Sequence, residues 1–483
     1  MKKDLVFYIV GINTTIIGLS MLIPAAWSLY YQSSDLQAIL ISSLITTICG
    51  LLLYFFLKPK EIEIRYKEGF GIVTFTWIFA TLFGTLPFLL SGTLVNFSDA
   101  IFESMSGFTT TGATILNDIE ALEPGVLFWR SLTHWLGGMG ILVLFIAILS
   151  LAGTGGLQVF KAETTGLTDN KLRPKLSETA KILWFTYLIL TLFLVLLLLA
   201  GGMSFYDALC HAFSALATGG FSTKNLSIGH YDSAYIQWVI TLFMFLAGIT
   251  FSLYYPFYRT KKLKVFYRHE EFRLYSFIVI AAVSFTTVIL FLYSDGQKFS
   301  KVLLDSAFQV ISIITTTGFS TVDYDLWPET LRIFIFGLMF IGGCTGSTVG
   351  SIKIGRFLIL FKQMSQEFKR IIHPKIVVKT KVSDKVIDDK HILNIMQFFF
   401  IFIFIFIISA VIISFDDLDF VTALSAAAAS ITNVGPALGL AGPMENYSAF
   451  SNFNKIYLSF LMLLGRLELY TVLVLLNPVF WKK

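Results

Sequence analysis

Charged side chains and cysteines are both scarce in this chain of 483 residues. Asp, Glu, Lys and Arg make up 14% of it, whereas soluble domains carry roughly 25%, so a soluble monomer is excluded. The three cysteines, Cys49, Cys210 and Cys344, lie in apolar, glycine-rich or short amphipathic segments. This placement predicts free thiols and excludes a disulfide framework. No short apolar leader with a small-residue cleavage site opens the sequence, so we expect the first helix to be retained.

Long apolar runs are present instead. Hydrophobic residues make up 55% of the chain, and its mean hydropathy is +0.76. A helix needs ~20 mostly apolar residues to cross a bilayer. We predict ten spans, at residues 5–31, 36–57, 70–91, 126–151, 179–201, 234–256, 272–293, 329–361, 392–414 and 452–476. The eighth contains so many glycines that we do not expect one continuous helix.

Basic residues gather on one side of these spans. The two termini and loops 58–68, 152–181, 257–273 and 353–391 hold 29 of the 36 Lys and Arg residues. Because cytoplasmic loops are enriched in Lys and Arg, this bias predicts that both termini are cytoplasmic. The opposite loops, with the adjoining ends of the spans, carry 17 acidic residues against four lysines. Such an excess attracts cations, although any single residue there is equally well explained as part of a solvated surface.

Four external segments repeat one plan, in which a short helical stretch is followed by a Thr/Gly-rich loop between two spans. They read SDAIFESMSGFTTTGAT (98–114), YDALCHAFSALATGGFST (206–223), LDSAFQVISIITTTGFST (304–321) and LDFVTALSAAAASITNVGPALG (418–439). Each repeat starts on the cytoplasmic side, so the repeats are parallel. The predicted fold is an all-α integral membrane protein with four parallel helix–re-entrant loop–helix repeats around a pseudo-fourfold pore. The predicted units are an N-terminal two-helix hairpin (1–66) and pore repeats at 67–155, 156–260, 261–365 and 366–483.

The short helices are too short to cross the bilayer, so they must be re-entrant and buried in protein or beside water. Their C-terminal ends precede the loops and favour a cation there. Glycine permits backbone geometries in which successive carbonyls face one axis and replace the hydration shell of an ion. One such loop alone would more simply be a helix C-cap; four in one chain predict an ion filter. Its predicted residues are Thr110, Thr111, Gly112, Thr218, Gly219, Gly220, Thr316, Thr317, Gly318, Asn433, Val434 and Gly435.

The loops and three further segments resemble the Trk-type potassium-uptake pore subunits (TrkH) of the Trk/Ktr/HKT superfamily. The further segments are HWLGGMG (134–140), FIGGCTGSTVGSIK (340–353) and GRLELYTVLVLLNP (465–478). The resemblance implies a bacterial inner-membrane homodimer, one pore per subunit, and a cytosolic nucleotide-binding regulator of the RCK/KTN type. Gly112 stands where sodium-selective plant relatives often have serine, which favours potassium. The second and fourth loops depart from Thr-Thr-Gly, so fine selectivity over sodium or rubidium stays open.

Two further features are predicted to take part in gating. The run 342–350 holds Gly342, Gly343, Gly346 and Gly350, and it is interpreted as a loop that closes the pore beneath the filter, with close helix packing as the alternative. Arg466 lies near the middle of the last span, where a charge is costly. It is interpreted as an electrostatic barrier, with a buried ion pair as the alternative.

Other polar residues in the spans receive structural interpretations. Arg130 and Arg332 lie near outer span ends and are expected to snorkel or pair locally. His134 and His211 are interpreted as packing residues.

We therefore predict selective potassium uptake through a gated pore controlled by a cytosolic subunit. A cation symporter or sodium-permeable carrier on the same fold is the alternative. An integral-membrane enzyme is disfavoured because the spans offer no nucleophile–base pair. Potassium at the filter is the expected ion, without an organic cofactor. Membrane lipid is an expected partner and nucleic acid is not.

Overall fold

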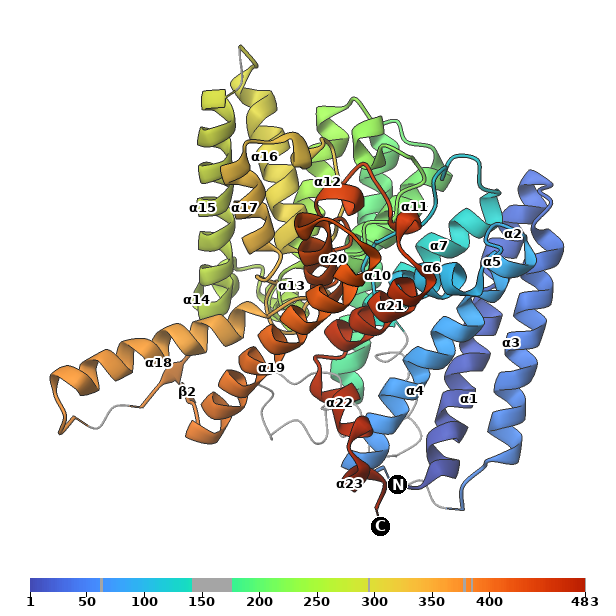
Figure 1. Cartoon of the computed structure of the whole chain (residues 1–483), viewed down its shortest axis with the longest axis horizontal. Coiled ribbons are helices and arrows are strands. Elements are labelled where there is room, and N and C mark those ends of the chain that lie inside the picture. The colour runs from blue at the N-terminus through green and yellow to red at the C-terminus, as the bar shows by residue number, and fades with distance from the viewer. Residues whose placement is uncertain (61–63, 141–175, 294–295, 377–378, 384, 483) are drawn as a thin grey trace.

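The computed structural model describes residues 1–60, 64–140, 176–293, 296–376, 379–383 and 385–482. This part of the chain is mostly helical and has very little strand (Figure 1). Its strands are β1 (Lys381–Val382) and β2 (Lys385–Val386), which form a short antiparallel pair. The two termini lie close together at the lower end in Figure 1.

An N-terminal hairpin packs on one side of the molecule. It consists of α1 (Lys3–Ser20), α2 (Leu22–Tyr31) and α3 (Leu36–Phe56). Glycines let α1 and α3 approach closely: a Cβ at Gly11 would come within 2.7 Å of the Gly50 carbonyl oxygen. A Cβ at Gly18 would likewise overlap Thr47. Small residues at a helix contact are the usual basis of close packing in membranes.

Helices of the four predicted repeats follow in chain order. The first contains α4 (Tyr66–Gly84), α5 (Leu86–Leu90), α6 (Phe97–Phe108), α7 (Pro124–Trp135) and the π-helix η1 (Leu136–Gly140). The second contains α10 (Leu176–Ala200), α11 (Phe205–Ala217), α12 (Ala234–Ala247) and α13 (Tyr254–Thr260). The third contains α14 (Lys264–Arg268), α15 (Glu270–Tyr293), α16 (Phe299–Ile314), α17 (Glu329–Leu338) and α18 (Ile354–Ile372). The fourth contains α19 (Asp389–Ile413), α20 (Phe420–Thr432), α21 (Asn452–Arg466), α22 (Tyr470–Leu476) and α23 (Pro478–Trp481).

Short 3₁₀ helices lie in the connections. They are η2 (Ser227–His230), η3 (Phe251–Leu253), η4 (Tyr324–Leu326), η5 (Ser414–Asp416), η6 (Gly439–Ala441) and η7 (Tyr447–Ala449). The predicted unit boundary at 155 lies outside the described residues. Helix α18 runs across the one at 365.

Six segments in the described part of the chain are long and apolar enough to cross a membrane as single spans. Two more are broken: α12 meets the η3–α13 segment at 92°, and α21 meets α22 at 118°. The predicted span 329–361 is not one helix either, since α17 ends at Leu338 and α18 begins at Ile354. The span predicted at 126–151 continues beyond residue 140, outside the described residues. The second spans of repeats two, three and four therefore all break near their middle.

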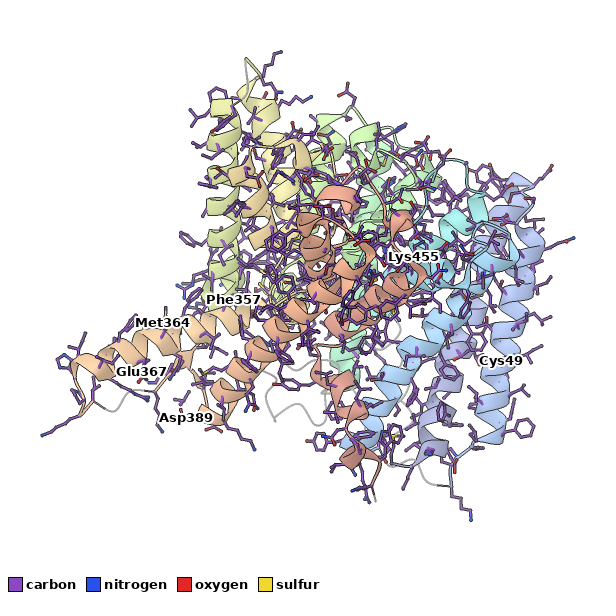
Figure 2. The ribbon with its side chains drawn as sticks, in the orientation of Figure 1. Cys49, Phe357, Met364, Glu367, Asp389 and Lys455 are labelled. Carbon is purple, nitrogen blue, oxygen red and sulfur yellow. The ribbon has the colours of Figure 1, made fainter. Side chains whose placement is uncertain are left out.

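Helix α18 departs most from the predicted span. It projects from the body towards the lower left in Figure 1, and its labelled Met364 and Glu367 lie well away from the other helices in Figure 2. Phe361, Met364 and Phe368 are exposed along it, whereas Lys362 and Glu367 give it a polar side. Such a pattern belongs to an amphipathic helix rather than to a span that is apolar on all sides.

Candidate functional site: four glycine loops and the segment beneath them

The four short helices α6, α11, α16 and α20 end in the same turn. A left-handed residue ends each helix, with φ of 52° at Thr110, 55° at Thr218, 49° at Thr316 and 57° at Asn433. It is the C-cap itself in α11 and α20 and directly follows the C-cap in α6 and α16. The next amide in each loop donates to a carbonyl five residues back, for example Thr111 N to Ser106 O at 2.9 Å and Val434 N to Ala429 O at 2.9 Å. This is the Schellman arrangement. Each of the four loops therefore begins as a helix C-cap, and each also contains a left-handed glycine.

A second left-handed residue comes two positions later in every loop. It is Gly112, Gly220, Gly318 or Gly435, with φ of 81°, 85°, 78° and 94°. The residue between has negative φ in each case. Left-handed residues that alternate with ordinary ones turn successive carbonyls towards the same side of a chain, and only glycine adopts the second position without strain.

The four loops contact one another in a closed ring. A Cβ at Gly112 would overlap the carbonyl oxygen of Gly219, and one at Gly220 would overlap that of Thr317. A Cβ at Gly318 would overlap the carbonyl oxygen of Val434, and one at Gly435 that of Thr111. Each glycine therefore faces the middle residue of the next loop, and the fourth loop returns to the first. The structure thus brings together the twelve residues that the repeats predict as one site.

Threonine hydroxyls brace two of the loops from behind. Thr111 bonds Thr109, and Thr317 bonds Thr315, both at 2.8 Å between hydroxyl oxygens. In the fourth loop the Asn433 side-chain amide donates to Thr111 Oγ1 and to Met462 O, both at 2.9 Å. The second loop has Gly219 at the position of Thr111 and Thr317, so this hydroxyl brace is missing there.

A hollow of about 120 Å³ lies against the ring on the side formed by the residues that follow the glycines in the chain. Gly112, Gly220 and Gly318 line it, together with Lys224 and Glu445. Glu445 is the one acidic residue among its lining residues, so the predicted acidic excess lies farther out. In one of those outer loops, a hydrogen bond from the Asn225 side chain holds the pKa of Asp118 below its usual value.

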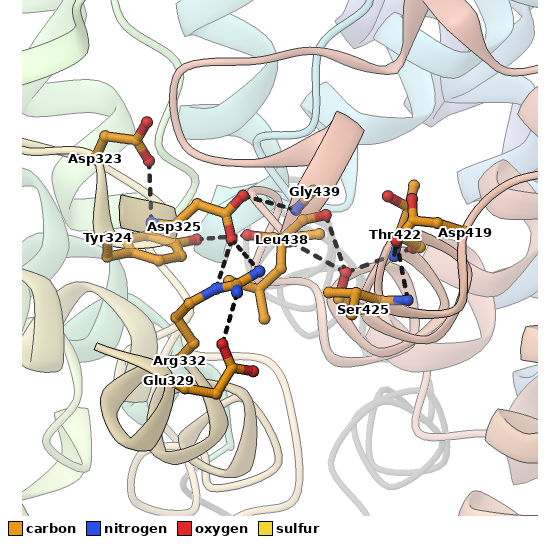
Figure 3. Close-up of polar contacts among 12 residues, drawn as sticks. Asp323, Tyr324, Asp325, Glu329, Arg332, Asp419, Thr422, Ser425, Leu438 and Gly439 are labelled. Carbon is orange, nitrogen blue, oxygen red and sulfur yellow. Dashed lines mark hydrogen bonds and ion pairs between the residues drawn. The ribbon is translucent and has the colours of Figure 1, made fainter. Parts of the chain in front are cut away.

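Polar ties hold the outer parts of repeats three and four together (Figure 3). Arg332 Nε donates to Asp325 Oδ1 at 3.0 Å, and Asp325 Oδ2 accepts from Gly439 N at 3.0 Å. The Tyr324 hydroxyl donates to Ala437 O at 3.1 Å. Arg332 also pairs with Glu329, so it pairs locally as predicted. These ties fix the chain directly after the fourth loop.

The glycine-rich segment 342–350 lies between the third loop and the bend of the second repeat. Gly350 N donates to the Thr316 hydroxyl at 2.8 Å, and Cys344 N donates to Gly248 O at 2.9 Å. Glu271, a buried carboxylate of α15, accepts from Thr345 N at 2.5 Å and from its hydroxyl at 2.9 Å. The segment therefore touches the predicted filter directly and is held from two other helices.

Arg466 joins this segment to the first repeat. Its guanidinium donates to Thr348 O at 2.8 Å, to Gly137 O at 2.8 Å and to Gly138 O at 2.9 Å. Glu468 pairs with Arg356 at the start of α18. Between α21 and α22, Leu469 has φ of 59° and ψ of −61°, and Tyr470 N donates to Glu468 O at 2.7 Å. This is a γ-turn of the strained kind that functional sites retain.

Sequence reasoning missed three carboxylates that organise the site, namely Glu103, Glu271 and Asp325. Glu103 offered one signal in the sequence, because it is an ionisable residue within a short, mostly apolar helical stretch; in the structure it is fully buried. Its partner is Arg130, at 2.6 Å between Nε and Oε1. Arg130 is buried as well, which excludes snorkelling. The three cysteines are free, as predicted.

Comparisons with known proteins agree with one another. Residues 35–483 match the family model TrkH, described as cation transport protein. The chain is 38% identical to the Trk system potassium uptake protein TrkH of Halomonas elongata, with 100% of both chains covered. It is 36% identical to the protein of that name in Escherichia coli K12, with 98% of both covered. The crystal structure of the potassium transporter TrkH from Vibrio parahaemolyticus matches with a TM-score of 0.90 and 32% identity over 100% of both chains.

Proposed function

The chain belongs to the TrkH family of cation transport proteins, and on this premise we propose that it takes up potassium through a selective, gated transmembrane pore. The observation that carries the proposal is the closed ring of four glycine loops. In this proposal the twelve residues, three from each loop, supply backbone carbonyls around one axis, and carbonyl rings of this kind replace the hydration shell of a monovalent cation. The negative ends of α6, α11, α16 and α20 point at the same place and favour a cation there.

The segment 342–350 is the proposed gate, together with Arg466. Three observations support it. The segment bonds Thr316 of the third loop, it has glycines at the places where it meets other backbone, and Arg466 ties it to the first repeat. To open the pore, segment 342–350 would have to break these contacts and form others. A loop with two alternative conformations can do this, whereas a rigid helix interface cannot.

Regulation by a cytosolic nucleotide-binding subunit is part of the proposal, as is a homodimer in the bacterial inner membrane with both termini cytoplasmic. The proposed docking face is the basic side of loop 353–391. Its exposed end carries Lys369 and Arg370 on α18 and Lys381 on β1. Loop 152–181 was predicted as the other half of this face, and its residues 152–175 lie outside the described residues. Anionic lipid is the competing ligand for such a basic surface.

Growth of a potassium-uptake-deficient bacterium on low potassium tests the proposal. We expect the chain to restore growth together with uptake of labelled rubidium, and we expect the uptake to be inhibited by potassium more strongly than by sodium. Expression at normal level without uptake would contradict the proposed function. Uptake that required a sodium or proton gradient would identify the symporter alternative.

A further inference from the structure

The second loop contains an aromatic ring held between two side chains of another repeat. Phe221 directly follows Gly220, and its ring is buried. The Arg130 guanidinium carbon lies 3.6 Å from the ring centroid. The His134 ring stacks on Phe221 with 4.1 Å between centroids and 16° between planes. Arg130 and His134 are four residues apart on α7, so they share one face of that helix.

His134 also explains why the second loop departs from the Thr-Thr-Gly pattern. The three atoms nearest to a Cβ at Gly219 all belong to the His134 ring, and at 2.3–2.6 Å all three would overlap it. The ring therefore occupies the space that the Thr111 and Thr317 side chains fill in the first and third loops. His134 Nδ1 lies 3.2 Å from the Ser214 hydroxyl of α11, which fixes the ring against the second repeat.

Arg130 connects the first loop to the second. Its Nε donates to Glu103, and its Nη1 donates to Ser222 O at 2.9 Å. Glu103 in turn accepts from the Thr114 hydroxyl at 3.0 Å and from Ile115 N at 3.1 Å. One buried ion pair thus reaches the backbone just beyond Gly220 and just beyond Gly112. A guanidinium can do this because its donors form a rigid planar fork and its face can lie on an aromatic ring.

We propose that Glu103, Arg130, His134 and Phe221 form a clamp that sets the spacing between the first two loops and thereby the discrimination between potassium and sodium. The clamp replaces, in the second loop, the hydroxyl brace found in the first and third. Arg130 and His134 are positioning residues, since they act through the loop backbone and not on the ion. This inference rests on the proposed function and assigns a specificity role to residues outside the twelve of the filter.

A reciprocal substitution tests the clamp in the full-length chain reconstituted into liposomes. Gly219→Thr alone should abolish discrimination or uptake, because its side chain would collide with His134. His134→Ala alone should keep uptake but lower the potassium-to-sodium permeability ratio by roughly tenfold. The double variant should recover most of that ratio, because the smaller residue at 134 makes room for the threonine. Arg130→Lys should lower the ratio too, since lysine keeps the charge but cannot form the fork.

Phe243→Ala is the matched control, because Phe243 is a buried ring of α12 that packs on Phe193. It should lower the melting temperature without changing the permeability ratio. A wild-type chain that fails to conduct potassium would overturn the proposed function itself. A conducting wild type whose ratio is unchanged by His134→Ala and Arg130→Lys would overturn the clamp alone. Effects of Gly219→Thr and His134→Ala that simply add would overturn it as well.

Discussion

At the scale of the residue, Gly112 combines two constraints that a side chain cannot meet. Its φ is 81°, and its missing Cβ leaves room for the Gly219 carbonyl oxygen. We expect Gly112→Ser to raise sodium permeability relative to potassium, because the neighbouring carbonyl must move off its position and a hydroxyl is added. Reversal potentials in mixed potassium and sodium solutions measure the change.

Gly92 provides the control for backbone strain. It has φ of 75° with nothing within 4 Å of a Cβ, in the turn before α6, at the opposite end of that helix from the first loop. A left-handed non-glycine residue costs roughly 1–2 kcal/mol, so Gly92→Ser should lower stability without changing selectivity. If Gly112→Ser behaved like Gly92→Ser, Gly112 would not belong to a filter.

Arg466 is the second residue whose role can be separated by substitution. Removal of its charge and of its three carbonyl contacts by Arg466→Ala should increase flux at normal expression. Arg466→Lys keeps the charge, so little change in flux indicates an electrostatic barrier. If the flux of Arg466→Lys lies between that of the wild type and that of Arg466→Ala, the guanidinium acts by holding Thr348 and the Gly137–Gly138 backbone in place. Loss of both flux and melting temperature in the two variants would assign Arg466 a purely structural role.

At the scale of the element, the glycine-rich segment 342–350 depends on a carboxylate from another helix. Glu271→Gln should increase basal flux, because the charge-assisted hydrogen bonds to Thr345 become weaker. Bonds to charged groups contribute about 1.5–3 kcal/mol, and loss of half of that is roughly a three- to tenfold shift between closed and open states. Single-channel recording of open probability measures it.

Glu270 is the matched control for this substitution. It precedes Glu271 on the same helix and pairs with Lys362 near the surface, where an ion pair contributes little. Glu270→Gln should leave open probability unchanged. Equal open probability in the wild type and Glu271→Gln would show that the segment is a packing element.

The sequence predicts the four loops better than it predicts the helix breaks and the buried polar pairs. The four loops were found because Thr and Gly recur at fixed positions after short helices, and that recurrence is local. The break after α17 was predicted from its glycines, whereas the breaks after α12 and α21 were not located, because apolar content continues across them while the backbone turns. The pairing of Glu271 with Thr345, 74 residues away, has no local signal. Buried pairs of this kind depend on the assembled fold. For the same reason the sequence did not identify Glu103 as the partner of Arg130.

At the scale of the whole molecule, the N-terminal hairpin does more than add two spans. Asp35, in the turn between α2 and α3, accepts from Val126 N at 2.8 Å in the first turn of α7. A capping carboxylate contributes about 0.5–2 kcal/mol, so Asp35→Ala should lower the melting temperature of the purified protein. Ser34→Ala is the control, since the Ser34 hydroxyl makes an exposed contact with Glu123. Equal melting temperatures for the two variants would contradict a capping role for the hairpin.

The closed order of the four loops has a consequence for how this chain can change during evolution. Each glycine accommodates a carbonyl of the next loop, so a side chain at one position displaces a neighbour, and the displacement returns through the ring to its origin. Two such substitutions act on one shared geometry, and their costs are not expected to add. Outer loops can vary residue by residue, whereas Gly112, Gly220, Gly318 and Gly435 constrain one another across more than 300 positions of sequence. A new ion preference on this scaffold therefore requires coordinated replacements in several repeats, or changes in the side chains that support the loops from behind.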